Sequence, residues 1–146
     1  MSYVMKYFTL REFERSATAE ERGIDNTIPH VGEINIRKLV EKILDPAREK
    51  FGKGIVVTSG YRCQQLNEVL VETSGASPTS LHRFGMAADI IALGGKDHEE
   101  LLQIFKKLPC YELIVYRSVR NPDRIIRFHV AYKEGATSRT MFSKFV

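Results

Sequence analysis

The sequence predicts an α+β fold in which helices pack on a small, mostly antiparallel sheet. Amphipathic helical patterns dominate the first half of the chain, whereas short apolar segments rich in β-branched and aromatic residues cluster in the second half. This order favours a layer of helices on one sheet. With 146 residues, no internal repeat and no long linker, the chain is expected to form a single domain, residues 1–146.

Two helices are expected before the first strand. In YFTLREFERS, Thr9 and Glu12 have the spacing of a capping box. A longer helix is expected from about residue 33 to residue 50, because apolar residues recur at three- and four-residue steps. Pro46 interrupts that stripe and should kink or restart the helix, since its ring removes a backbone donor.

The middle of the chain alternates strand and helix signals. GIVVTS is expected to be a short buried strand, SGYR a turn and SGASPTS a loop. RCQQLNEVLVE and DHEELLQIFKKL have helical periodicity, and Asp97 and Glu100 have capping spacing in the second. MAADIIAL is an apolar strand that only Asp89 interrupts.

The last expected element is a β-hairpin between YELIVY and IIRFHVAY, with its turn at Asn121–Pro122–Asp123. Strand alternation places Ile126 on the buried face and His129 on the more polar face. If Tyr116 and Ile125 close the hairpin, the facing pairs are 115–126, 114–127, 113–128 and 112–129. Glu112 would then lie opposite His129, with Cβ atoms about 5 Å apart.

Composition restricts the function classes. Lys and Arg total 22 against 18 Asp and Glu, a formal charge of +4, but no basic run exceeds two residues. Nucleic-acid binding is therefore disfavoured, whereas a mildly basic surface suits an anionic partner such as a bacterial cell wall.

Cys63 and Cys110 belong to no CxxC pair and are expected to be small buried hydrophobes. No secretory signal or membrane span is visible, so synthesis in the cytoplasm is expected.

Polar residues inside apolar strands are candidates for a functional site. Burying the Asp89 carboxylate costs on the order of several kcal/mol unless it is hydrogen-bonded, paired or bound to a cation. Taken alone, Asp89 and His129 are more often structural residues. His82, Asp89 and His129 together form a recurring catalytic zinc set, with water at the fourth position. Gly85 would ease the bend that brings His82 towards Asp89.

These residues resemble a known family. SGYR, SLHRFGMAAD and FHV, in this order, are similar to the motifs of peptidase family M15, the zinc D-alanyl-D-alanine carboxypeptidases. The opening YFTLREFERSATA and the helix end LDPAREKFG resemble its small phage- and prophage-type members, so the resemblance covers nearly the whole chain. It implies a fold like that of the DD-peptidases and the Hedgehog signalling domain.

The resemblance also implies roles for individual residues. His82, Asp89 and His129 would bind Zn²⁺, which would activate a water for attack on a peptide carbonyl. Arg62 would stabilise the oxyanion or hold a substrate carboxylate, as a planar guanidinium can. Ser80 would contact the substrate.

The chain departs from the family pattern at the general base. Relatives commonly carry an acidic residue three positions before the last histidine, where this chain has Ile126. The hairpin pairing suggests Glu112 as a replacement that orients or deprotonates the water. A solvated strand carboxylate is an equal alternative, and a one-residue register slip would turn Glu112 to the opposite face.

The leading hypothesis is a zinc peptidase that cleaves peptidoglycan stem peptides, as a carboxypeptidase or as a phage endolysin released to the cell wall. A second hypothesis is a non-catalytic zinc-containing module that binds cell wall or protein, since the Hedgehog domain retains zinc while acting as a ligand. A third treats His82, Asp89 and His129 as structural polar residues without a metal.

Overall fold

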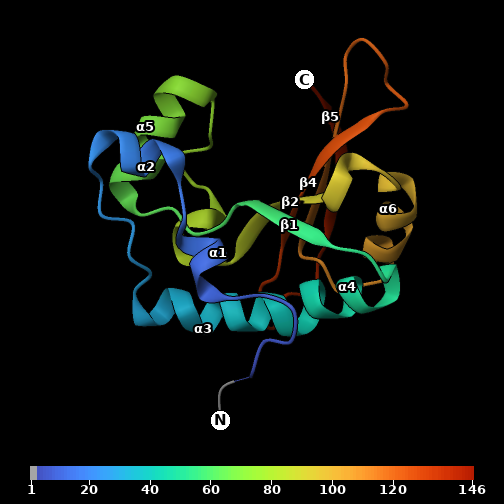
Figure 1. Cartoon of the computed structure of the whole chain (residues 1–146), viewed down its shortest axis with the longest axis horizontal. Helices are drawn as coiled ribbons and strands as arrows, with labels where there is room; N and C mark the ends of the chain where they lie inside the picture. Colours follow the sequence, from blue (N-terminus) through green and yellow to red (C-terminus); the bar gives the residue numbers. More distant parts are fainter. Residues whose placement is uncertain (1–2) are drawn as a thin grey trace.

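The computed structural model of the chain describes residues 3–146 and has the expected α+β architecture (Figure 1). A five-stranded sheet lies at its centre, and the longest helical segment crosses one face of it. The helices are α1 (Leu10–Glu14), α2 (Ala17–Arg22), α3 (His30–Leu39), α4 (Asp45–Phe51), α5 (Gln64–Ser74) and α6 (His98–Lys106). The strands are β1 (Ile55–Ser59), β2 (Ala87–Ala92), β3 (Glu112–Arg117), β4 (Ile125–Ala131) and β5 (Thr140–Phe145).

The long amphipathic pattern forms a nearly continuous helical segment. It begins at His30, three residues before the expected start, and the π-helical turn η1 (Val40–Leu44) links α3 to α4. This wide turn immediately precedes Pro46, which cannot donate a hydrogen bond to the preceding turn. The expected disturbance at Pro46 is confirmed.

One expected cap is present and one is absent. The Thr9 backbone N–H donates to Glu12 Oε2 at 2.7 Å at the start of α1. The cap expected from Asp97 is wrong, because Asp97 adopts a left-handed conformation (φ 67°) and makes no side-chain cap bond. Its carboxylate instead pairs with Lys53 Nζ at 2.9 Å, which ties the start of α6 to the segment before β1.

The sheet has the order β1-β2-β4-β3-β5. The pairs β1–β2, β2–β4 and β3–β4 are antiparallel, so the expected mostly antiparallel sheet is confirmed. The edge strand β5, which the sequence pattern did not predict, pairs in parallel with β3. All six residues of β5 are exposed. The strand therefore has no buried face whose apolar residues would mark it in the sequence.

The hairpin register differs from the expected one by two residues. Glu112 pairs with Ala131, and His129 pairs with Ile114, so the expected 112–129 pairing is wrong. Because side chains alternate with a period of two, a two-residue shift keeps Glu112 and His129 on the same face as diagonal neighbours. Half of the shift arises because the turn closes at Arg117 and Ile125, one residue later on β3 than expected.

A β-bulge near the turn accounts for the other residue of the register shift. It also shows that the expected burial of Ile126 is wrong. Tyr116 pairs with Arg127 but Arg117 pairs with Ile125, so Ile126 is an extra residue in β4. Ile125 rather than Ile126 is consequently buried in the core. Phe128 and Val130 face the core as expected.

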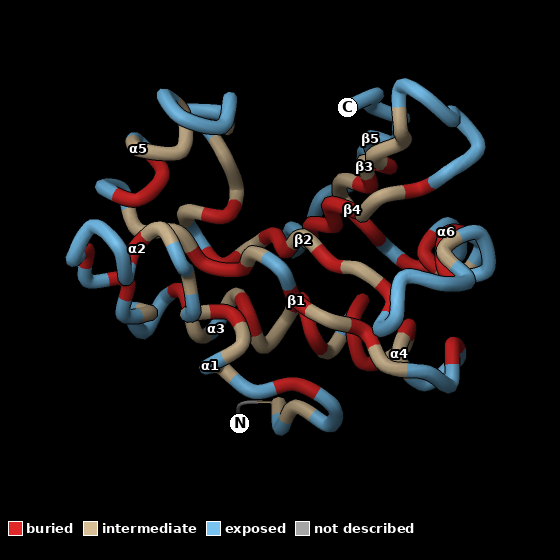
Figure 2. Tube along the Cα trace, turned by 45° about the horizontal axis from the view of Figure 1, so that its top comes forward, coloured by how far each residue is buried: buried red, intermediate tan, exposed pale blue. Residues whose placement is uncertain are grey.

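The hydrophobic core lies between one face of the sheet and the helices α3, α4 and α6. Its strand residues include Ile90, Phe128 and Val130, and its helix residues include Leu39 and Phe105, all fully buried. Figure 2 shows the buried segments concentrated in the strands and in the helices beneath them, while the hairpin tip is exposed. Tight packing on one face leaves the opposite face of the sheet available for a site.

Other expectations concern cysteines and membranes. Cys63 and Cys110 form no disulfide; Cys110 is buried, whereas Cys63 is only partly buried and its sulfur accepts the Leu66 N–H at the start of α5. No helix among residues 3–146 is both long and apolar enough to cross a bilayer.

The buried Asp45 fastens the N-terminal segment to the helical layer. Its carboxylate accepts hydrogen bonds from the Tyr3 hydroxyl at 2.6 Å and from the backbone N–H groups of Lys6 and Tyr7 at 2.8 and 3.1 Å. The hydrogen bond to Asp45 raises the pKa of Tyr3 to about 12. We expect Asp45→Ala to lower the free energy of unfolding by about 3 kcal/mol, measured by denaturant titration.

Glu49 provides the matched control, since its carboxylate pairs with Lys6 Nζ at 3.2 Å in an exposed position of the same helix. Glu49→Ala should leave the unfolding midpoint nearly unchanged, because exposed ion pairs contribute little. Equal effects of the two substitutions would contradict the anchoring role of Asp45.

Candidate metal centre

Three side chains from separate segments meet on the open face of the sheet. His82 lies in the 3₁₀ turn η2 (Leu81–Phe84), Asp89 in β2 and His129 in β4. Asp89 and His129 are direct cross-strand partners, which brings them together on one face. One ligand atom from each of the three residues lies within 4.8 Å of the others. The residues grouped by the sequence argument are therefore neighbours in space.

Two glycines allow close backbone packing around His82, Gly85 against α3 and Gly60 against α1. Gly85 ends the turn with φ 74°, and a Cβ there would lie 2.6 Å from the Gly32 carbonyl oxygen, so the expected bend at Gly85 is confirmed. At Gly60, in the SGYR turn, a Cβ would lie 2.5 Å from Phe13 Cα. The carbonyl oxygen of Gly60 lies 2.7 Å from His82 Nδ1.

The Gly60 contact determines which nitrogen of His82 can bind a metal. A carbonyl oxygen can only accept, so we assign the Nδ1 proton to this bond. Burial lowers the pKa of His82 although Asp89 opposes this shift, and Nε2 is the ring nitrogen that the Gly60 contact leaves available to a metal. His82 Nε2 faces Asp89 Oδ1, 3.3 Å away. A proton or a metal ion between these two atoms would satisfy both of them.

The distances from Asp89 to the two histidines fit zinc. Asp89 Oδ1 lies 3.3 Å from His82 Nε2 and 3.2 Å from His129 Nδ1. Tetrahedral zinc with ligands at about 2.0–2.1 Å has ligand atoms about 3.3–3.4 Å apart. Two imidazole nitrogens and one carboxylate oxygen also match the ligand types of open zinc sites. The residues present thus fit a Zn²⁺ ion.

The surrounding charges stabilise this arrangement. Burial opposes the ionisation of Asp89, but His82 and His129 hold the pKa of its carboxyl well below the usual range. Burial also opposes a charge on His129, yet its hydrogen bonds to Asp89 and Glu112 raise its pKa to about 9. A metal ion would therefore displace a proton from His129 at neutral pH.

Arg62 lies beside the Asp89 carboxylate. Its Nη2 is 3.5 Å from Asp89 Oδ2, and its Nε donates to Ser59 Oγ at 3.2 Å. The guanidinium is largely buried, and burial lowers its pKa although Asp89 opposes this shift. Because only part of its five donor hydrogens is used, Arg62 retains donors that can reach a ligand in the adjacent cleft.

Glu112 contacts the centre through His129. Its Oε1 lies 2.8 Å from His129 Nε2, and this hydrogen bond lowers the pKa of Glu112. Since His129 Nδ1 faces Asp89, Nε2–H donates to Glu112 and fixes the orientation of the ring. The expected register is wrong, but Glu112 still lies next to His129, because a shift of two residues keeps both side chains on the same face of the sheet.

Ser80 lies at the edge of the same centre. Its hydroxyl oxygen accepts the backbone N–H of His82 at 3.2 Å and caps the 3₁₀ turn. Ser80 also lines the cleft over the centre. Ser80 therefore stabilises the 3₁₀ turn and also borders the cleft, where the sequence argument expects it to contact a substrate.

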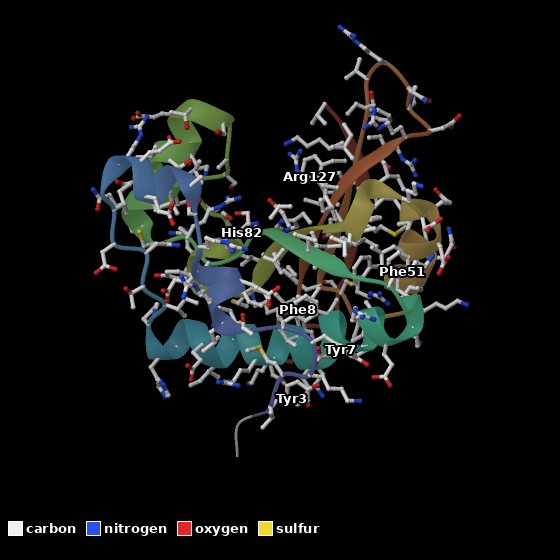
Figure 3. All side chains as sticks on the ribbon, in the orientation of Figure 1. Tyr3, Tyr7, Phe8, Phe51, His82 and Arg127 are labelled. Carbon is white, nitrogen blue, oxygen red and sulfur yellow. The ribbon has the colours of Figure 1, made fainter. Side chains whose placement is uncertain are left out.

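This cleft, of about 580 Å³, opens over the three residues between the α5–η2 segment and the sheet. A second cavity, of about 670 Å³, borders α2 and β1 and shares Arg62 and Asp89 with the first. In Figure 3, His82 lies on the α5 side and Arg127 on the strand side of this region. A chain-like ligand could therefore approach the centre from two directions.

The cleft wall includes polar side chains to which the sequence argument assigned no role, among them Tyr116, Arg127 and Lys144. Arg127 could have been found, since strand alternation places it on the same face as His129. Lys144 could not, because β5 carries no recognisable strand pattern.

Comparison with known proteins agrees with this geometry. A scan against protein-family models matches residues 6–121 to the family described as Peptidase M15. The matched range includes Arg62, His82, Asp89 and Glu112, whereas His129 lies beyond its end. A search of the curated proteins finds no match.

Proposed function

The chain belongs to the peptidase M15 family, and from this premise we propose that it is a zinc-dependent peptidase that cleaves the stem peptides of peptidoglycan. Peptidase-like activity follows from the family. Zinc, the peptidoglycan substrate and the carboxypeptidase or endolysin mode of action are our proposal. We also propose that residues 1–146 act as one catalytic domain.

One observation carries the proposal. His82 Nε2, Asp89 Oδ1 and His129 Nδ1 come from separate segments and converge, with Asp89 Oδ1 3.3 Å from the first nitrogen and 3.2 Å from the second. Two imidazole nitrogens and one carboxylate oxygen at these distances support a bound zinc ion.

The residues around the centre supply the remaining parts of a hydrolytic site. Zinc held by three protein ligands would supply a water whose pKa is lowered to about 7. Arg62, anchored by Ser59 and Asp89, would direct its remaining N–H groups at the oxygen of the peptide carbonyl, where negative charge develops. Ser80 would hold the substrate backbone at the cleft edge.

We assign proton transfer to Glu112. Its hydrogen bond to His129 holds one carboxylate oxygen in place and favours the ionised form that a general base requires. Glu112 borders the cleft, and its second oxygen, Oε2, makes no hydrogen bond within residues 3–146. Glu112 would thus replace the acidic side chain that family members commonly carry at the position of Ile126.

We further propose that the protein acts on the cell wall as a phage or prophage lysin, released from the cytoplasm by a partner. Its formal charge of +4 would assist approach to an anionic wall.

The test is hydrolysis of purified peptidoglycan and of synthetic stem peptides, with new termini identified by mass spectrometry. Protein with one equivalent of zinc should cleave, a chelator should abolish cleavage, and added zinc should restore it. Stoichiometric zinc and wall binding without cleavage from about pH 5 to 9 would favour the non-catalytic module. Absence of stoichiometric zinc would overturn the metal site itself.

A further inference from the structure

The open face of the sheet is organised in rows of cross-strand neighbours. The row that contains the metal centre crosses the sheet through Ile114, His129, Asp89 and Ser59. Two residues further along the strands, Lys144 pairs with Tyr116, and Tyr116 pairs with Arg127. Directly paired residues share a face, so these three side chains form a second row beside the first.

We call Lys144, Tyr116 and Arg127 the cationic row. The Arg127 guanidinium carbon lies 4.0 Å from the centroid of the Tyr116 ring, a stacked contact that restricts the arginine. Arg127 is half-buried and Lys144 is exposed, and both border the cleft. Two positive groups therefore lie next to the metal centre, one of them held in place by the aromatic ring.

These cations are not neutralised by the protein. Neither Arg127 nor Lys144 forms an ion pair with any carboxylate of residues 3–146. By contrast, Arg62 pairs with Asp89 within the centre. A stacked arginine and a lysine directed at the same cleft, without an acidic partner, are typical of a surface that receives an anion.

On the other side of the row that contains the metal centre lies a negatively charged side chain, Glu112. Glu112 pairs with Ala131, two residues along β4 from His129 and away from Arg127. The face thus runs from a carboxylate, through the metal centre, to the cationic row. A ligand with a negative group at one end can bind in one orientation only, since the reverse orientation would bring it against Glu112.

We propose that the cationic row is a carboxylate-binding subsite that orients the peptide substrate and selects peptides with a carboxylate next to the cleaved bond. The proposal rests on the function proposed above and adds the substrate class to it. The carboxylate has two possible sources in a peptide: the C-terminal group or an acidic side chain. The first source corresponds to carboxypeptidase action and the second to cleavage within a chain.

Three synthetic peptides with the same backbone distinguish these sources. One has a free C-terminus and neutral side chains, one has an amidated C-terminus and one glutamyl side chain, and one is amidated and neutral. Binding to the zinc-loaded protein is measured by NMR titration, and cleavage is followed by mass spectrometry in the same samples. We expect one carboxylate peptide to bind about 10- to 100-fold more tightly than the neutral peptide.

Variants locate the preference in the cationic row. Arg127→Gln and Lys144→Gln should each reduce the preference for the carboxylate peptide and leave the dissociation constant of the neutral peptide unchanged. Lys144 lies on an exposed strand, so this variant remains informative if Arg127→Gln disturbs folding. Arg120→Gln is the matched control: it removes the same charge from the exposed hairpin tip, outside the cleft.

The outcomes separate the subsite from the proposed function. Equal binding of all three peptides, or equal weakening of all three by Arg127→Gln, would overturn the subsite even if cleavage occurs. A carboxylate preference that depends on Arg127 and Lys144, without cleavage of any peptide, would support the subsite and remove the peptidase proposal. Cleavage with the expected preference supports both.

Discussion

His129→Ala should eliminate stoichiometric zinc binding and lower peptidase activity by at least about 1000-fold, because a water without the metal has a pKa near 15.7 instead of about 7. Zinc content after dialysis against metal-free buffer, measured by mass spectrometry, should fall from about one equivalent to below about 0.1. The side chain is 10% exposed and contacts two carboxylates, so its loss removes a ligand atom and the partner of Asp89 and Glu112 together.

The family match ends before His129, so this variant tests a ligand assigned by geometry rather than by the matched range. His30→Ala is the matched control, since His30 is exposed at the start of α3 and lies outside the cleft. It should keep full zinc content and activity. A His129→Ala protein that retains one equivalent of zinc would show that the metal, if present, binds elsewhere.

Local sequence signals were sufficient for most of the fold. Helical periodicity located α3, α4 and α6, and apolar runs located β1, β2 and the β3–β4 hairpin, because each of these elements buries one face. The three candidate ligands could be grouped because each is a polar residue at a strand or turn that the apolar pattern isolates. Their convergence needed the β2–β4 pairing, which no local pattern specifies.

The errors have identifiable physical causes. The hairpin register depends on where the turn closes and on a bulge at Ile126, both of which are determined by the folded sheet. Strand β5 buries none of its residues, so periodicity could not reveal it. The position of Lys144 beside Tyr116 follows only from that strand, so the cationic row was invisible to sequence reasoning.

Glu112→Gln should lower the turnover rate by about 100- to 10,000-fold while zinc content stays at one equivalent. The glutamine carbonyl oxygen can still accept the His129 Nε2–H that Glu112 Oε1 accepts at 2.8 Å, so the orientation of the ring is retained. What is lost is a carboxylate that can take a proton. The pH profile should accordingly lose the acidic limb that reports ionisation of this group.

Glu112→Ala provides the comparison, since it removes both the proton acceptor and the support of His129. It should lower zinc affinity by about 10- to 100-fold as well as the turnover rate, because a ligand's hydrogen-bonding partner fixes its position. If Glu112→Gln were nearly as active as the unmodified protein and only Glu112→Ala were impaired, Glu112 would be a positioning residue for His129. The proton acceptor would then have to be a different group bordering the cleft, and the departure from the family pattern at Ile126 would remain uncompensated.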